Sequence, residues 1–434
     1  MHASVFNVVL SLATFWILKN FRLNIYYSFI YALFFAVLAY PVSGTPFVDL
    51  HSAFFSLLGV YSLILGIKTE KKIYWILLPI FFIFAFLSKQ VPSSYVMLST
   101  GITLFIFSYF MKKYYWIKYF FISSVLTIFL LLLFGKIQEI SLSSFLEQYI
   151  FYPQTIGEER IKNFAFTFGS VIDHFKFIYI AIIPLVFINI KKFFSEKNYL
   201  KDKNFYYFVI LFFFTASLIF HQLLTRNQTF IFFLIPILFA FSHINLEFIK
   251  SKNNYLISII FISICFFTTI KYHVRFNENR KFHELNYVDF KLSVDAGKID
   301  KKFKGLKWIT AEYKNSSNDE INIINTIKTH LITDNRNKML MTNYSFFSII
   351  LNEKLYSPSR WYIFDGTDYP LKGNKYYDSY KNLLVKLIEN NEIKVIYTIY
   401  PVESSLVYTY LDKNCFEEKK ISNMLSSYEI KNCF

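Results

Sequence analysis

Cysteine is scarce in this chain, with three residues among 434. So few cysteines exclude a disulfide-rich secreted scaffold, and no spacing of metal ligands is present. Cys265 lies within an apolar run, where a thiol is usually inert. Cys415 and Cys433 lie in the polar C-terminal part, so in an oxidising compartment they are candidates for a disulfide that closes a small terminal loop.

Several enzyme signatures are missing as well. The sequence has no Walker loop, no G-x-G-x-x-G fingerprint and no Ser-His-Asp order. These absences argue against the common nucleotide-binding and serine-hydrolase sites. The chemistry must therefore be sought in residues that no standard motif marks.

Acidic residues are also few, with 30 Asp and Glu against 46 Lys and Arg, which gives a net charge of +16. Such a balance could indicate nucleic-acid binding, but the distribution of the charges argues against it. The tail from Tyr272 is nearly balanced, with 24 basic and 20 acidic residues. The excess charge lies in turns between apolar segments, and we expect no nucleic-acid partner.

Apolar residues, by contrast, are abundant: 54% of the chain is hydrophobic and the mean hydropathy is +0.36. A membrane is the natural solvent for such a composition. Ten apolar segments are close to the length that spans a bilayer. They are residues 2–18, 25–40, 50–67, 73–88, 91–110, 119–135, 176–190, 205–221, 229–246 and 255–271.

Basic residues mark alternate turns between these segments. Fifteen Lys and Arg fall in one set of turns, including Lys19, Lys68 and Lys113, and only five fall in the other set. Cytoplasmic loops retain Lys and Arg, so we assign the first set to the cytoplasm. The other set of turns and the tail after Lys271 are then expected on the opposite side, which is the periplasm in a bacterial inner membrane.

The pattern predicts two domains. Residues 1–271 are expected to form a helical multi-pass membrane domain of about ten transmembrane helices. Residues 272–434 alternate between helical and strand patterns and are expected to form a soluble periplasmic α/β domain. In the long outer loop, the apolar spacing from Leu142 to Ile150 predicts an interfacial helix that Pro153 and Gly157 end.

Polar residues collect in the turns assigned to the outer face. Asp49 stands directly before an apolar segment, where a carboxylate is rare and often functional, although an acid there also suits a helix N-terminus. Lys89 is the lone cation of the next outer turn and is followed by Gln90. Either it binds a lipid-linked phosphate or it snorkels to the interface.

Two further groups complete the candidate site. The turn HQLLTRNQTF contributes His221 and Arg226, and an arginine there suits a phosphate or sugar, or anchors the interface. His51 follows Asp49 by two residues and is either a ligand or a structural side chain. We predict Asp49 as the catalytic residue, either as a base or as the ligand of a divalent cation. The predicted substrate-binding residues are Lys89, Gln90, Arg226, His51 and His221.

These residues also carry a family resemblance. SGTPFVDLHSAFFSLLG, followed one hairpin later by FLSKQVPSSYVML, resembles the polytopic GT-C glycosyltransferases, which include the aminoarabinose and protein mannosyl transferases. The resemblance covers about residues 1–270 and matches Asp49 and Lys89 to the family's acid and its Leu-Ser/Thr-Lys element. It implies transfer of a sugar from a polyprenyl-phosphate donor to a lipid or glycan acceptor of the cell envelope.

The chain departs from this family at its start. The family begins inside and presents a large first outer loop with its main catalytic acid, whereas the charge pattern here places Met1 outside. We therefore expect that a first span and first outer loop are missing, that Asp49 is the secondary acid, and that this polypeptide alone is inactive.

Other functions fit parts of the sequence. A lipid-linked oligosaccharide flippase or transporter would place charges along a path inside the spans, whereas these lie at the outer ends. An O-antigen polymerase or ligase would lean on an arginine-rich outer loop. A non-catalytic envelope scaffold would use the tail to bind partners and would tolerate Asp49→Asn.

Overall fold

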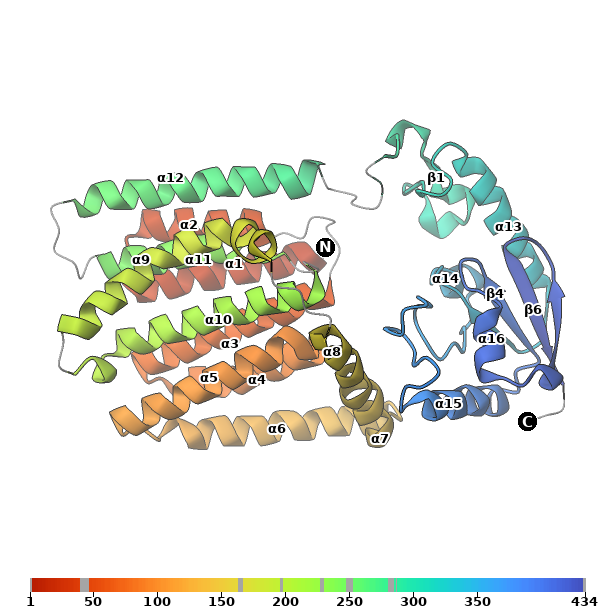
Figure 1. Ribbon diagram of the computed structural model, residues 1–434, viewed down its shortest axis with the longest axis horizontal. Coiled ribbons are helices and arrows are strands. Elements are labelled where there is room, and N and C mark those ends of the chain that lie inside the picture. The colour runs from red at the N-terminus through yellow and green to blue at the C-terminus, as the bar shows by residue number, and fades with distance from the viewer. Residues whose placement is uncertain are drawn as a thin grey trace. The chain divides into compact units, whose positions relative to one another are not determined.

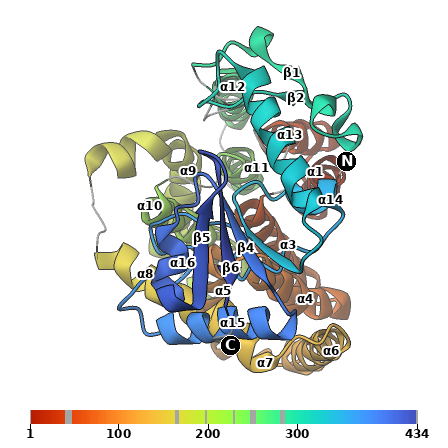
Figure 2. The same cartoon turned by 90° about the vertical axis from the view of Figure 1, so that its right-hand side faces the viewer.

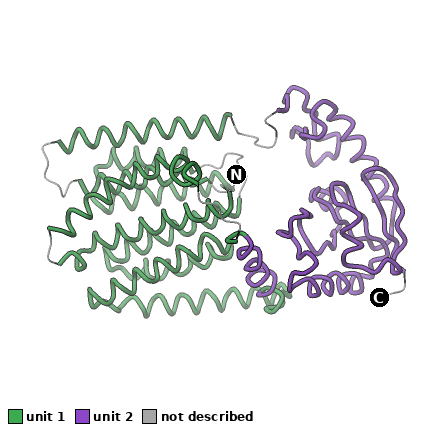
Figure 3. Tube along the Cα trace, viewed as in Figure 1, with its two compact units in different colours: residues 1–145, 160–281 green, residues 146–159, 282–434 purple. Residues whose placement is uncertain are grey.

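The computed structural model describes residues 2–39, 47–162, 167–195, 198–226, 230–246, 253–279, 285 and 287–431. It divides the chain into two compact units (Figure 3). Unit 1 comprises residues 1–145 and 160–281, and unit 2 comprises residues 146–159 and 282–434. The second unit thus begins about ten residues later than predicted and also takes in a short piece of the long loop.

Unit 1 is a bundle of helices that lie side by side (Figure 1). Each of the ten apolar segments is helical, because helices satisfy every backbone hydrogen bond within one segment. The helices are α1 (His2–Asn20), α2 (Ile25–Ala39), α3 (Val48–Thr69), α4 (Lys72–Ser88), α5 (Gln90–Met111), α6 (Trp116–Ile137), α9 (His174–Ser195), α10 (Lys203–Thr225), α11 (Leu234–Leu246) and α12 (Asn254–His273).

Not all of these helices have the length of a membrane span. Within the described residues, seven are long and apolar enough to cross a membrane, and three apolar helices are shorter: Ile25–Ala39, Lys72–Ser88 and Leu234–Leu246. The protein therefore has the helices of a membrane protein. The number of ten spans stays a prediction.

Helix α3 forms the centre of the bundle. The most apolar stretch of α3 is 89% buried, whereas the most apolar stretch of α6 is only 6% buried. Two glycines allow α4 to approach it closely. A Cβ on Gly59 would lie 2.6 Å from the ring of Phe82, and one on Gly66 would lie 2.9 Å from the ring of Trp75. The residues at the N-terminal end of α3 are consequently held in a well-packed frame.

Turns of the set assigned to the cytoplasm meet one another in unit 1. Glu70, after α3, pairs with Lys113, after α5, and its Oε1 lies 2.9 Å from Nζ of Lys203 at the start of α10. Three turns of the same predicted set thus gather at one end of the bundle. This grouping is what the alternating charge pattern requires.

The segment after α6 forms α7 (Leu142–Phe145), a π-helical stretch η1 (Leu146–Phe151) and α8 (Tyr152–Lys162). The prediction that Pro153 and Gly157 end the helix was wrong. Pro153 is the second residue of α8, where its missing N–H has no intrahelical partner to lose. Residues 146–159 belong to unit 2, where the Tyr152 hydroxyl donates to the carbonyl of Gly366 over 2.6 Å.

Unit 2 contains a four-stranded sheet with the order β3-β4-β6-β5, which can be followed in Figure 2. The strands are β3 (Lys338–Met341), β4 (Val395–Ile399), β5 (Phe416–Lys420) and β6 (Leu425–Ile430). β3 and β4 are parallel, and the other two pairs are antiparallel. A separate antiparallel pair joins β1 (Val294–Asp295) to β2 (Lys307–Trp308).

Helices cover both faces of this sheet, because successive strand residues point to opposite sides. Met339 and Ile396 pack with Leu384 of α15 (Tyr377–Asn390) and Val407 of α16 (Ser405–Tyr410). Their neighbours Leu340 and Val395 pack on the other face with α13 (Ser317–Thr333) and α14 (Phe347–Leu351). The predicted helix–strand alternation of the tail is confirmed as a helix–sheet–helix arrangement.

Short helical turns complete the described elements. They are π-helical at η2 (Gly169–Asp173) and η4 (Val274–Asn279), and of the 3₁₀ type at η3 (Tyr199–Lys201), η6 (Phe290–Leu292), η7 (Ala296–Lys298), η8 (Lys301–Phe303) and η9 (Lys413–Cys415).

Candidate functional site

Asp49 is the second residue of α3, and its side chain is 1% exposed. The N-cap of the helix is Phe47, so Asp49 sits inside the first turn, where the helix dipole favours a negative charge. A carboxylate buried to this degree must be compensated by partners, since desolvation of an isolated charge is costly. Two partners come from other helices.

The first partner is Lys89, which connects α4 to α5. Its Nζ lies 2.5 Å from Oδ1 of Asp49, and its side chain is 26% exposed. Its extended backbone interrupts the two helices, and its carbonyl accepts hydrogen bonds from Ser52 over 3.0 Å and from Ser93 over 2.7 Å. The lysine therefore bonds a buried acid, which snorkelling to the interface alone does not explain.

The second partner is His221, one turn before the end of α10. Its side chain is 1% exposed, and Nε2 lies 3.2 Å from Oδ1 of Asp49. Because a carboxylate oxygen accepts, Nε2 is the donor in this contact. Nδ1 is buried and makes no hydrogen bond within the described part of the chain. One oxygen of Asp49 thus joins an ammonium and an imidazole from two other parts of the bundle.

This arrangement can accept a proton and can also stabilise a negative charge. A carboxylate and an imidazole in contact are suited to accept a proton from a hydroxyl group, and a partly exposed ammonium is suited to meet an anion. Removing one member of such a buried pair leaves the other uncompensated, so the cluster acts as a unit. Arg160 of α8 lies within electrostatic range of His221 and adds positive charge nearby.

The other predicted ligands lie differently. His51 is two residues from Asp49 and so turns to another side of the helix. Its Nε2 lies 2.8 Å from Nε2 of His2, and its ring stacks on Phe6 of α1 with centroids 5.3 Å apart. The structure thus joins His51 to α1 and does not bring it to the pair of Asp49 and Lys89.

Gln90 and Arg226 lie close to the cluster in sequence. Gln90 begins α5 directly after Lys89, and its carbonyl accepts hydrogen bonds from Ser93 and Ser94. Arg226 caps α10 in the left-handed conformation with a φ of 54° and is exposed. Their part in substrate binding stays a prediction.

The described residues hold no ready-made metal site at Asp49. No group of three or more His, Cys, Asp or Glu side chains among them could hold a metal ion. Asp49 and His221 together supply two donors, so a divalent cation bound there would need further ligands.

Cys265 and Cys415 differ in oxidation state, as the sequence predicted. Cys265 is a free, buried thiol in α12, and Cys415 is disulfide-bonded. Cys433, its predicted partner, lies outside the described residues. Cys415 belongs to unit 2, whereas the candidate site belongs to unit 1.

Two residues of the site were not singled out in the sequence. Ser52 stands three residues after Asp49, on the same face of α3, and Ser93 follows Lys89 by four residues. Both hydroxyls hold the carbonyl of Lys89, which positions that side chain. Helical spacing from Asp49 was the signal for Ser52, but serines are too common in apolar helices for the spacing to be decisive.

Comparison with known proteins adds no identification. No family model matches the chain, and no curated protein or solved structure is similar to it.

Proposed function

We propose that this protein is a membrane glycosyltransferase of the GT-C type. It would move a sugar from a polyprenyl-phosphate donor to a lipid or glycan acceptor on the periplasmic face of a bacterial inner membrane. The observation that carries the proposal is the contact of Asp49 with Lys89 and His221. The three residues come from separate turns that the sequence analysis assigned to the outer face. The side chains of Lys89 and His221 both contact one buried carboxylate oxygen of Asp49.

The contact also supports the resemblance to the GT-C family. Asp49 and Lys89 are 40 positions apart and stand in the two segments that resemble that family. In unit 1 their side chains touch. If the two short patterns matched the family by chance, the side chains of Asp49 and Lys89 would not need to touch. If they belong to one site, as in the family, contact is expected.

The position of the cluster favours an outer-face reaction. Glu70, Lys113 and Lys203 come from turns assigned to the cytoplasm and meet at one end of α3. Asp49 stands at the other end of the same helix. The charge rule then assigns the Asp49 end to the outside, where a lipid-linked donor would present its sugar.

The proposed reaction is a single displacement. An acceptor hydroxyl attacks the anomeric carbon of the donor, a new glycosidic bond forms, and the bond from that carbon to the phosphate oxygen breaks. Asp49, with His221 beside it, accepts the hydroxyl proton. Lys89 stabilises the negative charge that develops on the departing polyprenyl phosphate. A general base and one well-placed cation each contribute about 10²-fold or more in comparable sites.

The test is covalent transfer from a set of polyprenyl-phosphate sugars labelled in the sugar. Membranes would contain the chain with and without its preceding reading frame, and the product would be separated from the donor by extraction. We expect labelled acceptor from the form that carries the preceding reading frame, and none from that form with Asp49→Asn at equal protein level. Movement of intact donor across the membrane, without a new glycosidic bond, would instead favour a transporter.

A further inference from the structure

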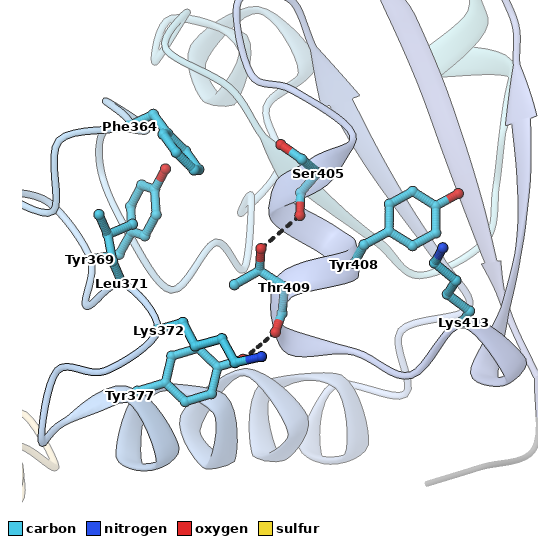
Figure 4. Close-up of a pocket in the computed structure, with 9 residues that line it drawn as sticks. All are labelled: Phe364, Tyr369, Leu371, Lys372, Tyr377, Ser405, Tyr408, Thr409 and Lys413. Carbon is cyan, nitrogen blue, oxygen red and sulfur yellow. Dashed lines mark hydrogen bonds between the residues drawn. The ribbon is translucent and has the colours of Figure 1, made fainter.

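Unit 2 contains an open cavity of about 560 Å³ that the reaction above does not use. Its volume lies within the range of cavities that bind small ligands. One wall is the loop that carries Phe364, Tyr369 and Lys372, and the other is α16 with Ser405 and Thr409 (Figure 4). A ligand can therefore enter between this loop and α16 without displacing any strand of the sheet.

Aromatic rings dominate the lining. Phe364, Tyr369, Tyr377 and Tyr408 all contribute to it, and the Phe364 side chain is 65% exposed. Tyr369 is buried, whereas Tyr377 and Tyr408 are half-buried, so the exposed Phe364 ring and these tyrosines offer apolar surface that a ligand can cover. Flat rings of this kind suit the C–H faces of sugar rings, which are weakly polar and stack on aromatic surfaces.

The hydroxyl groups of the lining are largely engaged within the protein. The Tyr408 hydroxyl donates to Glu418, that of Tyr377 donates to the Thr409 carbonyl, and Ser405 donates to Glu403 over 3.1 Å. These bonds leave acceptor capacity on the hydroxyl oxygens. The charged donors of the lining are on other residues.

Two lysines supply those donors. Lys372 and Lys413 both line the cavity (Figure 4), and Nζ of Lys413 lies 5.0 Å from the centroid of the Tyr408 ring. Neither lysine forms an ion pair with any described residue, and this cavity has no carboxylate in its lining. The charged side chains of the lining itself are therefore these two lysines, which suit an anion, while Glu403 and Glu418 accept hydrogen bonds from its Ser405 and Tyr408 hydroxyls.

A smaller cavity of about 260 Å³ continues the groove. It shares Phe364, Tyr369 and Ser405 with the first cavity but includes Glu403. A ligand that spans both would place its anionic group near the lysines and a neutral unit near Glu403. The groove thus favours a chain of at least two units over a single small anion.

We propose that this groove binds an acidic oligosaccharide, which is a glycan that carries carboxylate or phosphate groups. The proposal deepens the glycosyltransferase function, on which it rests for the role of that glycan as acceptor or product. The aromatic rings hold sugar faces, and Lys372 with Lys413 selects for the negative charge. Binding should weaken as salt rises, because part of it is electrostatic.

The test is isothermal titration of the purified full chain with five probes of three kinds. The acidic glycans are tetragalacturonate, sialyllactose and a phosphorylated disaccharide, the neutral glycan is maltotetraose, and the acidic peptide is hexaglutamate. We expect at least one acidic glycan to bind at least tenfold more tightly than maltotetraose and hexaglutamate. Equal binding of the neutral glycan or the peptide, or no binding of any acidic glycan, would overturn the proposal.

Variants locate the binding. Lys372→Gln with Lys413→Gln should weaken the acidic glycan at least tenfold, and Phe364→Ala, at an exposed side chain, should weaken it about as much. Lys381→Gln with Lys386→Gln removes two exposed lysines of α15 and is the matched control, which should bind as the native chain does. Unchanged binding in both groove variants would contradict the assignment.

The two proposals fail separately. Asp49→Asn should abolish transfer and leave titration with the acidic glycan unchanged. Binding that depends on the lysines without any sugar transfer would refute the glycosyltransferase and keep the groove. Transfer that depends on Asp49 without binding in the groove would do the reverse.

Discussion

Two buried carboxylates, one in each unit, are compensated in different ways. Asp49 and Glu320 each expose 1% of their surface. Asp49 contacts an ammonium and an imidazole, whereas Glu320 accepts hydrogen bonds from Trp308 over 2.9 Å, Thr310 over 2.8 Å and Tyr344 over 3.4 Å. No cation pairs with Glu320 in the described part of the chain.

We propose that this difference in partners separates a structural acid from a reactive one. Donors that are neutral at pH 7 hold Glu320 between β2 and the segment after β3, so it ties together parts of unit 2. Asp49 has titratable partners whose charge can change during a reaction. Burial alone does not distinguish the two, and the type of partner does.

The largest effect is expected from removing the cation of Asp49. Lys89→Met should lower transfer at least 100-fold and destabilise unit 1 by about 1–3 kcal/mol, because a buried carboxylate loses a charged partner. The double variant Lys89→Met with Asp49→Asn should regain stability without regaining activity. Thermal unfolding and transfer rates measure both.

Lys176→Met is the control for that change. Lys176 pairs with Asp173 at 2.8 Å, but both side chains are well exposed, at 47% and 66%. Exposed pairs contribute little, so stability and transfer should stay near native values. A loss equal to that of Lys89→Met would show that burial at Asp49 is not what matters.

The imidazole should matter less than the ammonium. His221→Gln keeps a donor for Asp49 but cannot share a proton with it, so transfer should fall about 10- to 100-fold. His51→Gln is the matched change. It replaces another histidine by glutamine, two residues from Asp49, but His51 contacts His2 instead of Asp49. It should leave the rate within about twofold. A greater loss with His51→Gln would move the reactive centre toward α1.

Asp334 tests ion pairing outside the helical bundle. Burial alone would raise its pKa, but hydrogen bonds from Arg336 and Tyr397 outweigh this and hold the pKa well below its ordinary value. Its stabilising effect is therefore present above the unfolded pKa of about 3.9 and is lost as pH falls through the folded pKa. Asp334→Asn should destabilise unit 2 by about 1–3 kcal/mol at pH 7 and by less in acid.

The destabilisation of unit 2 can be measured in the full chain by hydrogen exchange of the β4 amides, after correction for the intrinsic exchange rate at each pH. Transfer activity should not change. A destabilisation that is the same at neutral and acidic pH would show that charge is not the cause.

The smallest effect is expected at Glu320, with the opposite dependence on pH. Burial raises the pKa of Glu320, and the hydrogen bonds from Trp308, Thr310 and Tyr344 only partly offset this. Its contribution is then greatest below the unfolded pKa and is lost as pH rises through the folded pKa. Glu320→Gln should remove that slope in β4 exchange, with no more than about 1 kcal/mol gained or lost at pH 7. A native slope in the variant would contradict the assignment.

Much of the helical architecture could be predicted from the sequence, because apolar runs bounded by basic turns have few alternatives. The ten segments are helical, and the ends differ by a few residues, as at Ser195, where α9 runs past the predicted end. The continuation through Pro153 was missed because proline is tolerated in a first turn, and the sequence did not show where that turn began.

The site could be predicted only in part. Composition and turn assignment singled out Asp49, Lys89 and His221, but not their contact, because it depends on how α3, α5 and α10 pack. His51 looked equivalent to His221 in the sequence, and only the direction of its side chain on α3 separates the two. Glu320 was not noticed, since a glutamate in the first turn of a helix usually lies at the surface.

The most direct measurement compares Asp49→Asn and Glu320→Gln in the same transfer assay. Both replace an equally buried carboxylate by its neutral amide, so the loss of a buried charge is matched. With equal amounts of folded protein, we predict that Asp49→Asn loses at least 100-fold in sugar transfer while Glu320→Gln stays within about twofold. Native transfer by Asp49→Asn, or an equal loss in both variants, would contradict a reactive role for Asp49.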